Sequence, residues 1–354
     1  GRALKITVII AVTVAHWLFD RIGLRWLWWR LTGGGARRAR LPTEALIRQA
    51  FEWMGPTFIK LGQVVASSPG LFPKRYSDEF KRCLDEVPSF DLAIVRQTIE
   101  EDLGRPIPEI FKSMEDMPLG SASIAQVHGA VLPDGRSVVI KVQRPGIADV
   151  VDADLWWMQR GAWILEKLFR TARLANLTGV IDDFDRTIHE EIDFEREAEN
   201  LSEFNAMMAK HEIDDVRAPK PIEGLVSRRV LVMERFFGFK ADDVEGVAAA
   251  GMDPEVYLRK GLRAWLLTVV LHGFFHGDAH AGNLMMLPDG PACGFLDFGI
   301  IGRFDDQQRG QVIRYVLAFA AQDYASLAEI MMEIGAVSES IDKEALVGDL
   351  EAVY

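Results

Sequence analysis

The pattern of hydrophobic and polar positions changes character along the chain. Residues 43–103 carry apolar side chains at helical spacing, and Thr43 is expected to cap the first of these helices. Residues 123–146 alternate instead between apolar and polar side chains, and Asp134-Gly135 between two β-branched runs predicts a β-hairpin. The chain is therefore expected to pass from a helical region into a sheet.

The second half returns to helical spacing and then reaches a segment rich in polar side chains. Helical periodicity covers residues 149–210, a buried-strand candidate covers 228–236, and another helix is expected over 254–273. HGDAHAGN follows at 276–283, and LDFG at 296–299 comes after two short apolar runs around an Asp-Gly turn. This order predicts an α+β fold with two lobes. We expect four segments, at residues 1–40, 41–116, 117–236 and 237–354.

An apolar run near the N-terminus, ITVIIAVTVAHWLF at 6–19, is short for a bilayer crossing, which needs about 20 residues. Its flanks suit a membrane interface, because tryptophans and arginines gather there. The tryptophans are Trp17, Trp26, Trp28 and Trp29, and the arginines are Arg21, Arg25, Arg30, Arg37, Arg38 and Arg40. We expect residues 1–40 to contact a membrane, and the alternative is a helix that is buried or faces a partner.

Charge and cysteine content limit the possible partners. The formal net charge is -12, and an acidic chain is a poor candidate for sequence-independent nucleic-acid binding, which needs Lys and Arg to neutralise phosphates. The two cysteines, Cys83 and Cys293, lack ligand spacing, which argues against a disulfide framework or a structural zinc site and indicates a reducing compartment. We expect a membrane-associated protein on a cytoplasmic face. The start at Gly1 and the end at Tyr354 inside a helical pattern indicate a fragment of a longer protein.

Three side chains with oxygen ligands, Asp278, Asn283 and Asp297, follow one another at a spacing that suits phosphoryl transfer. In a kinase, a loop aspartate orients the accepting group, while a downstream asparagine and the aspartate of DFG hold Mg²⁺. HGD, four intervening residues, an asparagine, a short hairpin and DFG occur here in that order. The order predicts a phosphoryl-transfer site that uses Mg²⁺.

The histidines of the same segment allow a second interpretation, a metal-dependent hydrolase. His272, His276, Asp278 and His280 could supply ligands, and the first two are spaced as on one helical face. No Glu lies between these two as in HExxH, and the glycine after each would interrupt a helix. Phosphoryl transfer is favoured, with His276 and His280 orienting the loop.

Lys141, which lies on an apolar strand candidate, is a candidate for binding phosphate. A buried lysine needs a partner, and EIDFEREAEN at 191–200 supplies candidate carboxylates. The alternatives are a solvated lysine on an edge strand and a solvated charged helix face. Taken alone, each of the two segments favours its structural alternative over the functional role.

Together these segments resemble the UbiB/AarF-like family of atypical protein kinases, which is tied to ubiquinone and other prenyl-quinone lipids. The resemblance runs from about residue 45 to the end and rests on motifs that occur in the family's order. These are KxGQ at 60–63, a nucleotide loop at 121–123 followed by IAQVH, the kinase lysine Lys141, ExD at 191–193, Glu197, and Asp278, Asn283 and Asp297. The resemblance implies a bilobal protein-kinase-like fold with a helical N-terminal extension.

The resemblance also implies a role for each of these residues in using ATP and Mg²⁺. Lys141 would bind the α- and β-phosphates and Glu197 would hold Lys141. Asp278 would orient the acceptor, and Asn283 and Asp297 would bind the metal. Further nucleotide-binding residues would be Ser121, Ala122, Ser123 and Glu234. The family's extension lies over the active cleft as a regulatory lid, here formed by Lys60, Gly62, Gln63, Glu191 and Asp193, with Lys60 paired to Glu191 or Asp193.

Two departures from ordinary kinases matter. PLGSASIAQV at 118–127 replaces GxGxxG, with Gly120 as the one glycine before Gly129. A loop with Cβ atoms approaches phosphates less closely than glycine allows. The usual loop of the family has more alanines, and Gly120 and Ser121 depart from it, which bears on the nucleotide preference. HGD stands where ordinary protein kinases have HRD, so activation through a phosphorylated loop is not expected.

The resemblance implies an ATP-binding atypical kinase or ATPase that supports ubiquinone or other prenyl-quinone or isoprenoid lipid metabolism at a membrane. The partners it implies are membrane lipid or a prenyl-quinone-like lipid and enzymes of quinone biosynthesis. One alternative is a small-molecule phosphotransferase of the choline or aminoglycoside kinase type, which also uses HGD-x4-N but lacks KxGQ and ExD. The other is a non-catalytic nucleotide-binding scaffold.

Overall fold

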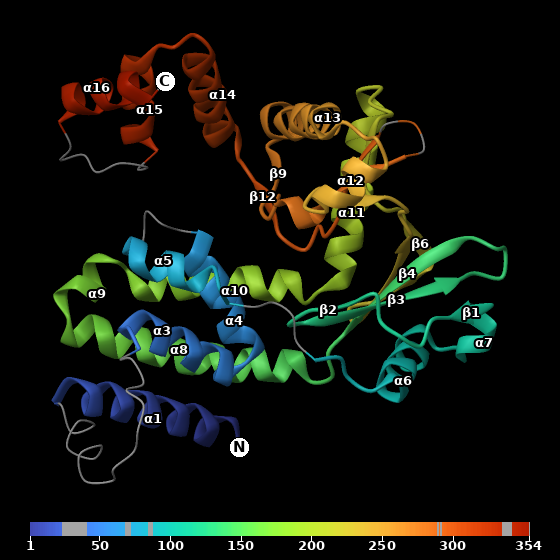
Figure 1. Ribbon diagram of the computed structural model, residues 1–354, viewed down its shortest axis with the longest axis horizontal. Helices are drawn as coiled ribbons and strands as arrows, with labels where there is room; N and C mark the ends of the chain where they lie inside the picture. The colour runs from blue at the N-terminus through green and yellow to red at the C-terminus, as the bar shows by residue number, and fades with distance from the viewer. Residues whose placement is uncertain are drawn as a thin grey trace. The chain divides into compact units, whose positions relative to one another are not determined.

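The computed structural model describes residues 1–22, 41–67, 72–83, 88–288, 290, 292–334 and 342–353. The chain forms two compact units, one made of Gly1–Arg196 and Pro221–Arg235 and the other of Glu197–Lys220 and Phe236–Tyr354. Each unit combines helices with a sheet (Figure 1), which confirms the predicted α+β class. The four expected segment boundaries stay a prediction.

Helix α1 (Arg2–Ile22) covers the apolar N-terminal run. Its stretch Arg2–Phe19 is, among the described residues, the one helix long and apolar enough to cross a membrane, judged by length and composition. α1 contacts α3 (Thr43–Met54) and α8 (Ile147–Leu168). The arginine-rich run from Arg25 onward and Trp26, Trp28 and Trp29 lie outside the described residues, so their membrane role stays a prediction.

The extension is built from α3, α4 (Pro56–Ser67) and α5 (Lys74–Phe80). A buried cluster that includes Ile59, Val65 and Phe80 holds these helices together. Gly62 is required by this packing, because a Cβ atom at that position would lie 2.7 Å from Cδ1 of Phe80.

Thr43 is the first residue of α3 and does not cap it, contrary to expectation. Pro42 occupies the cap position, with no side-chain hydrogen bond. The Thr43 hydroxyl instead accepts a hydrogen bond from the indole Nε1 of Trp17, at 3.3 Å. A contact between helices has therefore replaced the local contact that the sequence favours.

The sheet of the first unit is antiparallel, with strand order β1-β3-β4-β7-β6 and β2 paired to β3. Its strands are β1 (Ser113–Met114), β2 (Gly120–Ser121), β3 (Ala125–Val131), β4 (Ser137–Gln143), β6 (Pro221–Val226) and β7 (Val230–Glu234). The predicted hairpin is β3–β4, and Gly135 in its turn has a φ of 91°, which glycine adopts without strain. Alternate residues Val138, Ile140 and Val142 face the core with Val95 and Ile99 of α6 (Leu92–Leu103).

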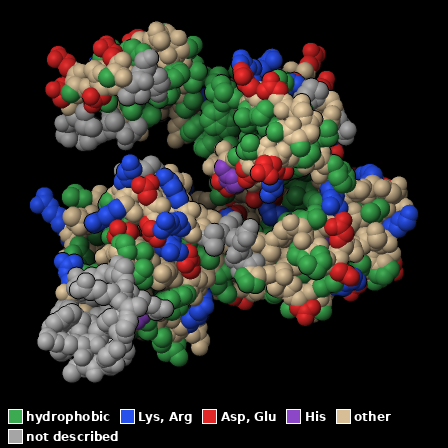
Figure 2. All heavy atoms as spheres, in the orientation of Figure 1, with side chains coloured by type: hydrophobic (Ala, Val, Ile, Leu, Met, Phe, Trp, Pro, Cys, Tyr) green, Lys and Arg blue, Asp and Glu red, His purple; other side chains and the backbone are tan. Residues whose placement is uncertain are grey.

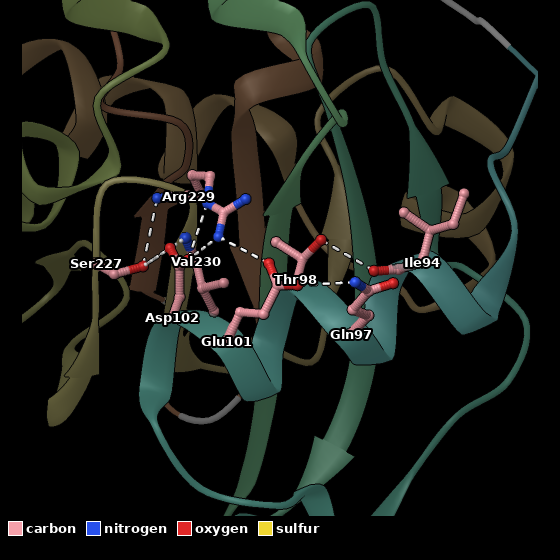
Figure 3. A network of polar contacts seen from close by, with 8 residues as sticks. All are labelled: Ile94, Gln97, Thr98, Glu101, Asp102, Ser227, Arg229 and Val230. Atoms are coloured by element: carbon pink, nitrogen blue, oxygen red, sulfur yellow. Dashed lines mark hydrogen bonds and ion pairs between the residues drawn. The ribbon is translucent and has the colours of Figure 1, made fainter.

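A polar network fastens α6 to the turn between β6 and β7 (Figure 3). Asp102 accepts hydrogen bonds from Nε of Arg229 at 2.8 Å and from the Ser227 hydroxyl at 2.7 Å. Partial burial acts to raise the pKa of Asp102, but these bonds outweigh it and the pKa is lowered. The Asp102 carboxylate therefore stays charged and holds the turn against the helix.

Helices are inserted after β4, in agreement with the predicted helical stretch. They are α8, α9 (Arg170–Leu174), α10 (Leu177–Glu191) and α11 (Phe194–Lys210). α10 packs along α8 (Figure 1), and the Gln143 side chain at the end of β4 donates to the Ile192 carbonyl at 2.6 Å. This bond ties the sheet to the end of α10, where the ExD motif lies.

The second unit has a four-stranded sheet in the order β5-β11-β10-β8 and a two-stranded pair, β12-β9. The strands are β5 (Val216–Arg217), β8 (Phe239–Lys240), β9 (Phe274–His276), β10 (Leu284–Leu287), β11 (Ala292–Phe295) and β12 (Ile301–Arg303). β10 and β11 form the second predicted hairpin, with Leu284 opposite Phe295. This register brings the chain before β10 next to the chain after β11.

The helices of the second unit are α12 (Val244–Ala249), α13 (Pro254–Leu267), α14 (Asp306–Ala320), α15 (Tyr324–Glu333) and α16 (Lys343–Val353). The helix predicted over 254–273 is α13, extended by a π-helical turn over Thr268–His272. Gly273 ends it with a φ of 64°, and its place cannot hold a Cβ, which would lie 2.6 Å from the Phe304 carbonyl oxygen. The chain then enters β9 and the HGDAHAGN loop.

Candidate active site

Lys141 lies on a central strand and not on a solvated edge. Its backbone is paired with Val127 of β3 on one side and Leu231 of β7 on the other. The Lys141 side chain is 8% exposed, and its Nζ lies 5.2 Å from the centre of the Phe194 ring, a cation–π distance. The edge-strand alternative is therefore wrong, and Lys141 is a buried cation on the face opposite the apolar core.

Glu197 is also buried, at 1% exposure, in the first turns of α11. A carboxylate is costly to bury unless it is paired or hydrogen-bonded. The solvated-helix alternative for the acidic run therefore fails at this position, while Glu195 and Glu199 of the same run are exposed. The run divides into buried and solvated acids, as the helical period requires.

The nucleotide loop predicted at 121–123 is held by an arginine that the sequence did not single out. Arg144, just after β4, donates from Nε to the Ala122 carbonyl and from a terminal nitrogen to the Ser121 hydroxyl, both at 2.9 Å. A further bond reaches the Pro88 carbonyl at 3.0 Å. Burial lowers the pKa of Arg144 from its ordinary value. Arg144 belongs to no recognisable motif. It can hold the loop because it directly follows β4.

Ser123 supplies a polar atom suited to binding an oxygen ligand. The residue is fully buried, and its hydroxyl has no hydrogen-bond partner among the described residues. An unsatisfied buried hydroxyl costs about 1–3 kcal/mol, which a phosphate oxygen able to reach it would recover. Glu234 is also predicted to contact the nucleotide. It is the last residue of β7 and lies opposite Val138, just before the chain passes into the second unit.

His276 orients the HGDAHAGN loop through both of its ring nitrogens. Nε2 lies 3.0 Å from the Leu296 carbonyl, and Nδ1 accepts from the backbone N–H of Asp278 at 3.2 Å. Burial lowers the pKa of His276, and the bond to Leu296 offsets only part of this effect. The neutral ring that results can donate at Nε2 and accept at Nδ1. The predicted orienting role of His276 is confirmed, and His280 acts similarly, because its Nδ1 accepts from the Gly282 N–H at 3.0 Å.

The loop also fixes Asn283 relative to Asp278. The Asn283 amide nitrogen donates to the Asp278 carbonyl at 3.0 Å and lies 3.4 Å from the Asp278 carboxylate. This use of the nitrogen leaves the amide oxygen Oδ1 as the Asn283 atom suited to a cation. The Asp278 side chain is about half exposed, at 48%, and is therefore accessible to a reacting group.

The β10–β11 hairpin brings Asn283 and Asp297 together. The backbone N–H of Leu296 donates to the Asn283 carbonyl at 2.8 Å, so the residue before Asp297 is bonded directly to Asn283. Asp297 has a φ of 55°, a left-handed conformation that is uncommon outside glycine. Uncommon backbone conformations of this kind cluster at functional sites.

Packing around DFG explains why this conformation is held. Phe298 is fully buried, with its ring centre 5.0 Å from those of both Phe204 and His276. The Phe298 carbonyl accepts a hydrogen bond from the Asn200 side chain at 3.0 Å. Asn200 in turn accepts from Arg303 of β12 at 3.2 Å. Asn200 closes the acidic run in the sequence, but Arg303 has no sequence signal.

The hydrolase interpretation is not supported by the placement of the histidines. His272 lies in the π-helical turn, with Nε2 2.8 Å from Nε2 of His211, and His276 is bonded as described. Across the described part of the chain, no group of three or more His, Cys, Asp or Glu side chains could hold a metal ion. A metal carried by phosphate oxygens needs fewer protein ligands, and Asn283 with Asp297 would be sufficient.

The predicted lid residues are brought together in part. Lys60 of α4 forms an ion pair with Glu191 at the end of α10. The Asp193 carboxylate accepts from the Glu195 N–H at 3.2 Å and lies 3.4 Å from Nε of Arg228. The ion pair confirms Glu191 as a partner of Lys60.

Comparison with known proteins places the chain in a family. A model of the ABC1 atypical kinase-like domain matches residues 82–331. An aarF domain-containing protein kinase of the Arabidopsis thaliana chloroplast is 37% identical over 310 residues, which cover 87% of this chain and 57% of the relative. A probable protein kinase UbiB from Marinobacter nauticus is 35% identical over 292 residues, covering 82% and 53%.

A solved structure is similar over most of the chain. It is the complex of Rv3197 with erythromycin from Mycobacterium tuberculosis, with a TM-score of 0.56 at 26% identity, and it matches over 81% of this chain and 71% of that chain. The described residues thus have a kinase-like fold with a helical N-terminal region. The chain belongs to the ABC1 family of atypical kinase-like proteins. It spans about half the length of those two relatives.

Proposed function

We propose that this chain binds ATP with Mg²⁺ and acts as a kinase or ATPase of the UbiB type. The observation that carries the proposal is the bond between the Leu296 N–H and the Asn283 carbonyl, beside Asp278 and the left-handed Asp297. The side chains of Asp278, Asn283 and Asp297 offer oxygen atoms, which are the ligands that Mg²⁺ prefers. Phosphoryl transfer depends mainly on such positioning and on electrostatic stabilisation.

The residues present fit a Mg²⁺ ion brought by ATP. Asn283 would bind it through Oδ1 and Asp297 through its carboxylate, since the nitrogen of Asn283 is occupied by Asp278. When bound, the ion would neutralise charge on the phosphate oxygens. Asp278, half exposed and held at its backbone by His276 and Asn283, would orient the accepting hydroxyl group or water.

The remaining residues would bind the nucleotide. Lys141 would bind the α- and β-phosphates, and its burial supports this role because a buried cation attracts an anion strongly. Ser121, Ala122 and Ser123 would line the phosphates, with Arg144 holding the loop. The roles of Glu197 as the partner of Lys141 and of Glu234 as a nucleotide contact stay predictions.

The biological setting rests on the family. The name of the Marinobacter relative supports a link to ubiquinone or another prenyl-quinone, and α1 supports association with a membrane. We propose the cytoplasmic side of that membrane. Lipid, prenyl-quinone and quinone-biosynthesis enzymes are the proposed partners. The proposed lid would restrict the access of large substrates to the site. Its residues are Lys60, Gly62, Gln63, Glu191 and Asp193. This restriction favours either a small or lipid-linked acceptor or slow ATP hydrolysis.

The proposal is tested by ATP and ADP binding and by ATP hydrolysis, with and without anionic vesicles containing a prenyl-quinone-like lipid. We expect wild type to bind and slowly hydrolyse ATP, Asp297→Asn to lose hydrolysis, and the control Asp306→Asn, at a 96% exposed carboxylate, to match wild type. Fast turnover of a free alcohol such as choline would instead identify a small-molecule phosphotransferase. If Asp278→Asn restored the biological function of the protein and Lys141→Ala did not, the chain would be a non-catalytic nucleotide-binding scaffold.

A further inference from the structure

The second half of α8 carries an exposed stripe in which aromatic and basic residues alternate. Trp156, Arg160, Trp163 and Lys167 are spaced by four, three and four residues, which places them on one face of the helix. The Arg160 guanidinium lies 5.2 Å from the Trp156 ring centre, and Lys167 Nζ lies 3.8 Å from that of Trp163. The stripe is therefore a series of cation–aromatic pairs facing solvent.

The tip that joins α8 to α9 is apolar as well as basic. Leu168 is 70% exposed, Phe169 54% and Leu174 76%. Arg170 and Arg173 are exposed between them. Exposed leucine and phenylalanine side chains gathered at one tip are unfavourable in water, so they mark a surface that contacts an apolar partner or a membrane.

The charge of the region indicates what this surface contacts. The region from Trp156 to Leu174 holds four basic residues and one acidic residue, within a chain whose formal net charge is -12. The one acid, Glu166, is engaged at the start of α10, where its carboxylate accepts from the Thr178 N–H at 2.8 Å. Figure 2 shows hydrophobic and basic side chains next to one another around α9, at the left edge of the view. Apolar tips between basic residues match an anionic lipid surface.

Helix α1 lies beside this region and adds a second apolar edge. Arg2 at the start of α1 pairs with the buried Asp154 of α8, and both helices run from there in the same direction (Figure 1). At about 1.5 Å per residue, Leu168 at the end of α8 lies about 21 Å along from that pair and Leu18 about 24 Å, so Leu18 and Phe19 are nearly level with the end of α8. Leu18 and Phe19 are exposed there, and Arg21 stacks over Trp17 at 5.0 Å.

The contacts of α1 favour a helix lying on a bilayer over one that crosses it. Its start is fixed by the Arg2–Asp154 pair, Ile6 and Ile9 are buried, and its far end is bonded through Trp17 to Thr43. Spanning would require these contacts to break and would leave the buried Asp154 carboxylate without its cation, which is strongly destabilising.

We propose that the α8–α9 tip (Leu168, Phe169, Arg170, Arg173 and Leu174), the stripe on α8 and the end of α1 form one surface that binds an anionic lipid bilayer. The proposal deepens the membrane association proposed above, because it also assigns binding to an element that is far in sequence from the N-terminal forty residues. α1 and the tip insert their apolar side chains at the headgroup level while the basic side chains contact lipid phosphates. α10, with its acids Asp182, Asp183 and Asp185, stays in water.

The test is sedimentation of the full chain with vesicles of phosphatidylcholine alone and of phosphatidylcholine mixed with phosphatidylglycerol. Arg170→Glu with Arg173→Glu is expected to lower partition onto the anionic vesicles at least about tenfold. Leu168→Glu is expected to lower partition onto both kinds of vesicle. The controls are Leu262→Glu and Arg263→Glu, exposed positions on α13 of the other unit, which should bind as wild type does.

A second measurement does not depend on a charge reversal. Quenching of tryptophan fluorescence by brominated lipid should fall in Trp163→Phe, which keeps an aromatic ring at that position. The proposal is overturned if the tip variants bind vesicles as wild type does, if the α13 controls lose binding equally, or if Leu168→Glu changes only self-association. ATP binding by the same variants should match wild type, so a failure of the proposed nucleotide function would be seen separately.

Discussion

The ammonium group of Lys60 and the carboxylate of Glu191 form an ion pair in which the two side chains are only 14% and 8% exposed. Lys60 lies in the middle of α4, and Glu191 ends α10, one of the helices inserted after β4. Removing one member of a largely buried ion pair is strongly destabilising. The pair therefore fixes the extension to the ExD motif.

Lys60→Ala and Glu191→Gln are each expected to lower the free energy of unfolding by about 1–3 kcal/mol, because each removes a largely buried ion pair. The double variant should lose less than the sum of the two, with a coupling of about 1 kcal/mol or more. If the extension restricts the site, both single variants also change nucleotide affinity or ATPase rate. Glu52→Gln, which breaks a pair with Arg48 on α3, is the control. Unchanged nucleotide affinity and rate in both variants would show that the pair is structural and that the lid role is wrong.

Gly62→Ala is expected to destabilise the extension. Alanine favours a helix over glycine by about 1 kcal/mol, but overpacking costs about 1–3 kcal/mol. Here the new methyl would lie 2.7 Å from a ring atom of Phe80, which is 2% exposed and cannot easily move. Denaturant unfolding measures the net loss, and Phe80→Leu should recover part of it.

Gly161→Ala is the matched control for this substitution. Gly161 lies inside α8, and a Cβ there would meet no atom within 4 Å. This variant should therefore gain up to about 1 kcal/mol from helix propensity. Equal effects of the two substitutions would show that the Phe80 contact does not explain the glycine of KxGQ.

Arg144→Lys is expected to weaken ATP binding about fivefold to thirtyfold. Lysine keeps the charge but cannot reproduce the forked contacts to the Ala122 carbonyl and the Ser121 hydroxyl. Each lost bond contributes about 1 kcal/mol to ordering the loop before the nucleotide arrives. Calorimetry on this variant and on Arg96→Lys, an exposed arginine of α6 paired with Asp116, separates the role of this loop from a general effect of exchanging arginine for lysine. Wild-type affinity in Arg144→Lys would mean that the loop is held for packing alone.

The two histidines His276 and His189 are expected to change stability with pH in opposite directions. Burial lowers the pKa of His276, so below about pH 6.5 the unfolded chain takes up a proton that the folded chain does not. Burial also acts to lower the pKa of His189, but hydrogen bonds to Asp185 and Asp152 outweigh it and raise the pKa. His276 thus contributes stability that is lost as pH falls, and His189 contributes stability that is lost as pH rises.

Unfolding free energies of wild type, His276→Gln and His189→Gln at about pH 8 and pH 5.5 check this assignment. The loss caused by His276→Gln should be larger at the higher pH, and the loss caused by His189→Gln larger at the lower pH. A His276→Gln loss that grows on acidification would contradict a neutral, orienting ring at the start of the loop.

Local patterns predicted much of the fold. The Asp-Gly turn of β3–β4 and the helical periods of α8 to α11 were recoverable because each depends on residues close in sequence. The same holds for His276, whose loop partner Asp278 lies two residues away. The π-helical turn before Gly273 was not predicted, because its sequence carries the same apolar period as an α-helix.

Contacts between distant segments were the part that sequence reasoning missed. Arg144 and Arg303 have no local motif, and each gains its role from a carbonyl, hydroxyl or amide delivered by another element. Thr43 was assigned the local role of a cap, while the fold uses its hydroxyl for Trp17. The hydrophobic periodicity could not predict such contacts, but the resemblance to a family did so in one case. It gave Glu191 as one of two expected partners for Lys60, more than a hundred residues away in sequence.

The central claim is that Asn283 and Asp297 bind the Mg²⁺ of a Mg²⁺–ATP complex. It is tested most directly by the ATP affinity of wild type and Asp297→Asn measured calorimetrically with and without free Mg²⁺. We expect Mg²⁺ to tighten ATP binding to wild type at least about tenfold, which is about 1.4 kcal/mol, and to leave Asp297→Asn unchanged. An equal effect of Mg²⁺ on both proteins, or no ATP binding by wild type, would contradict the claim.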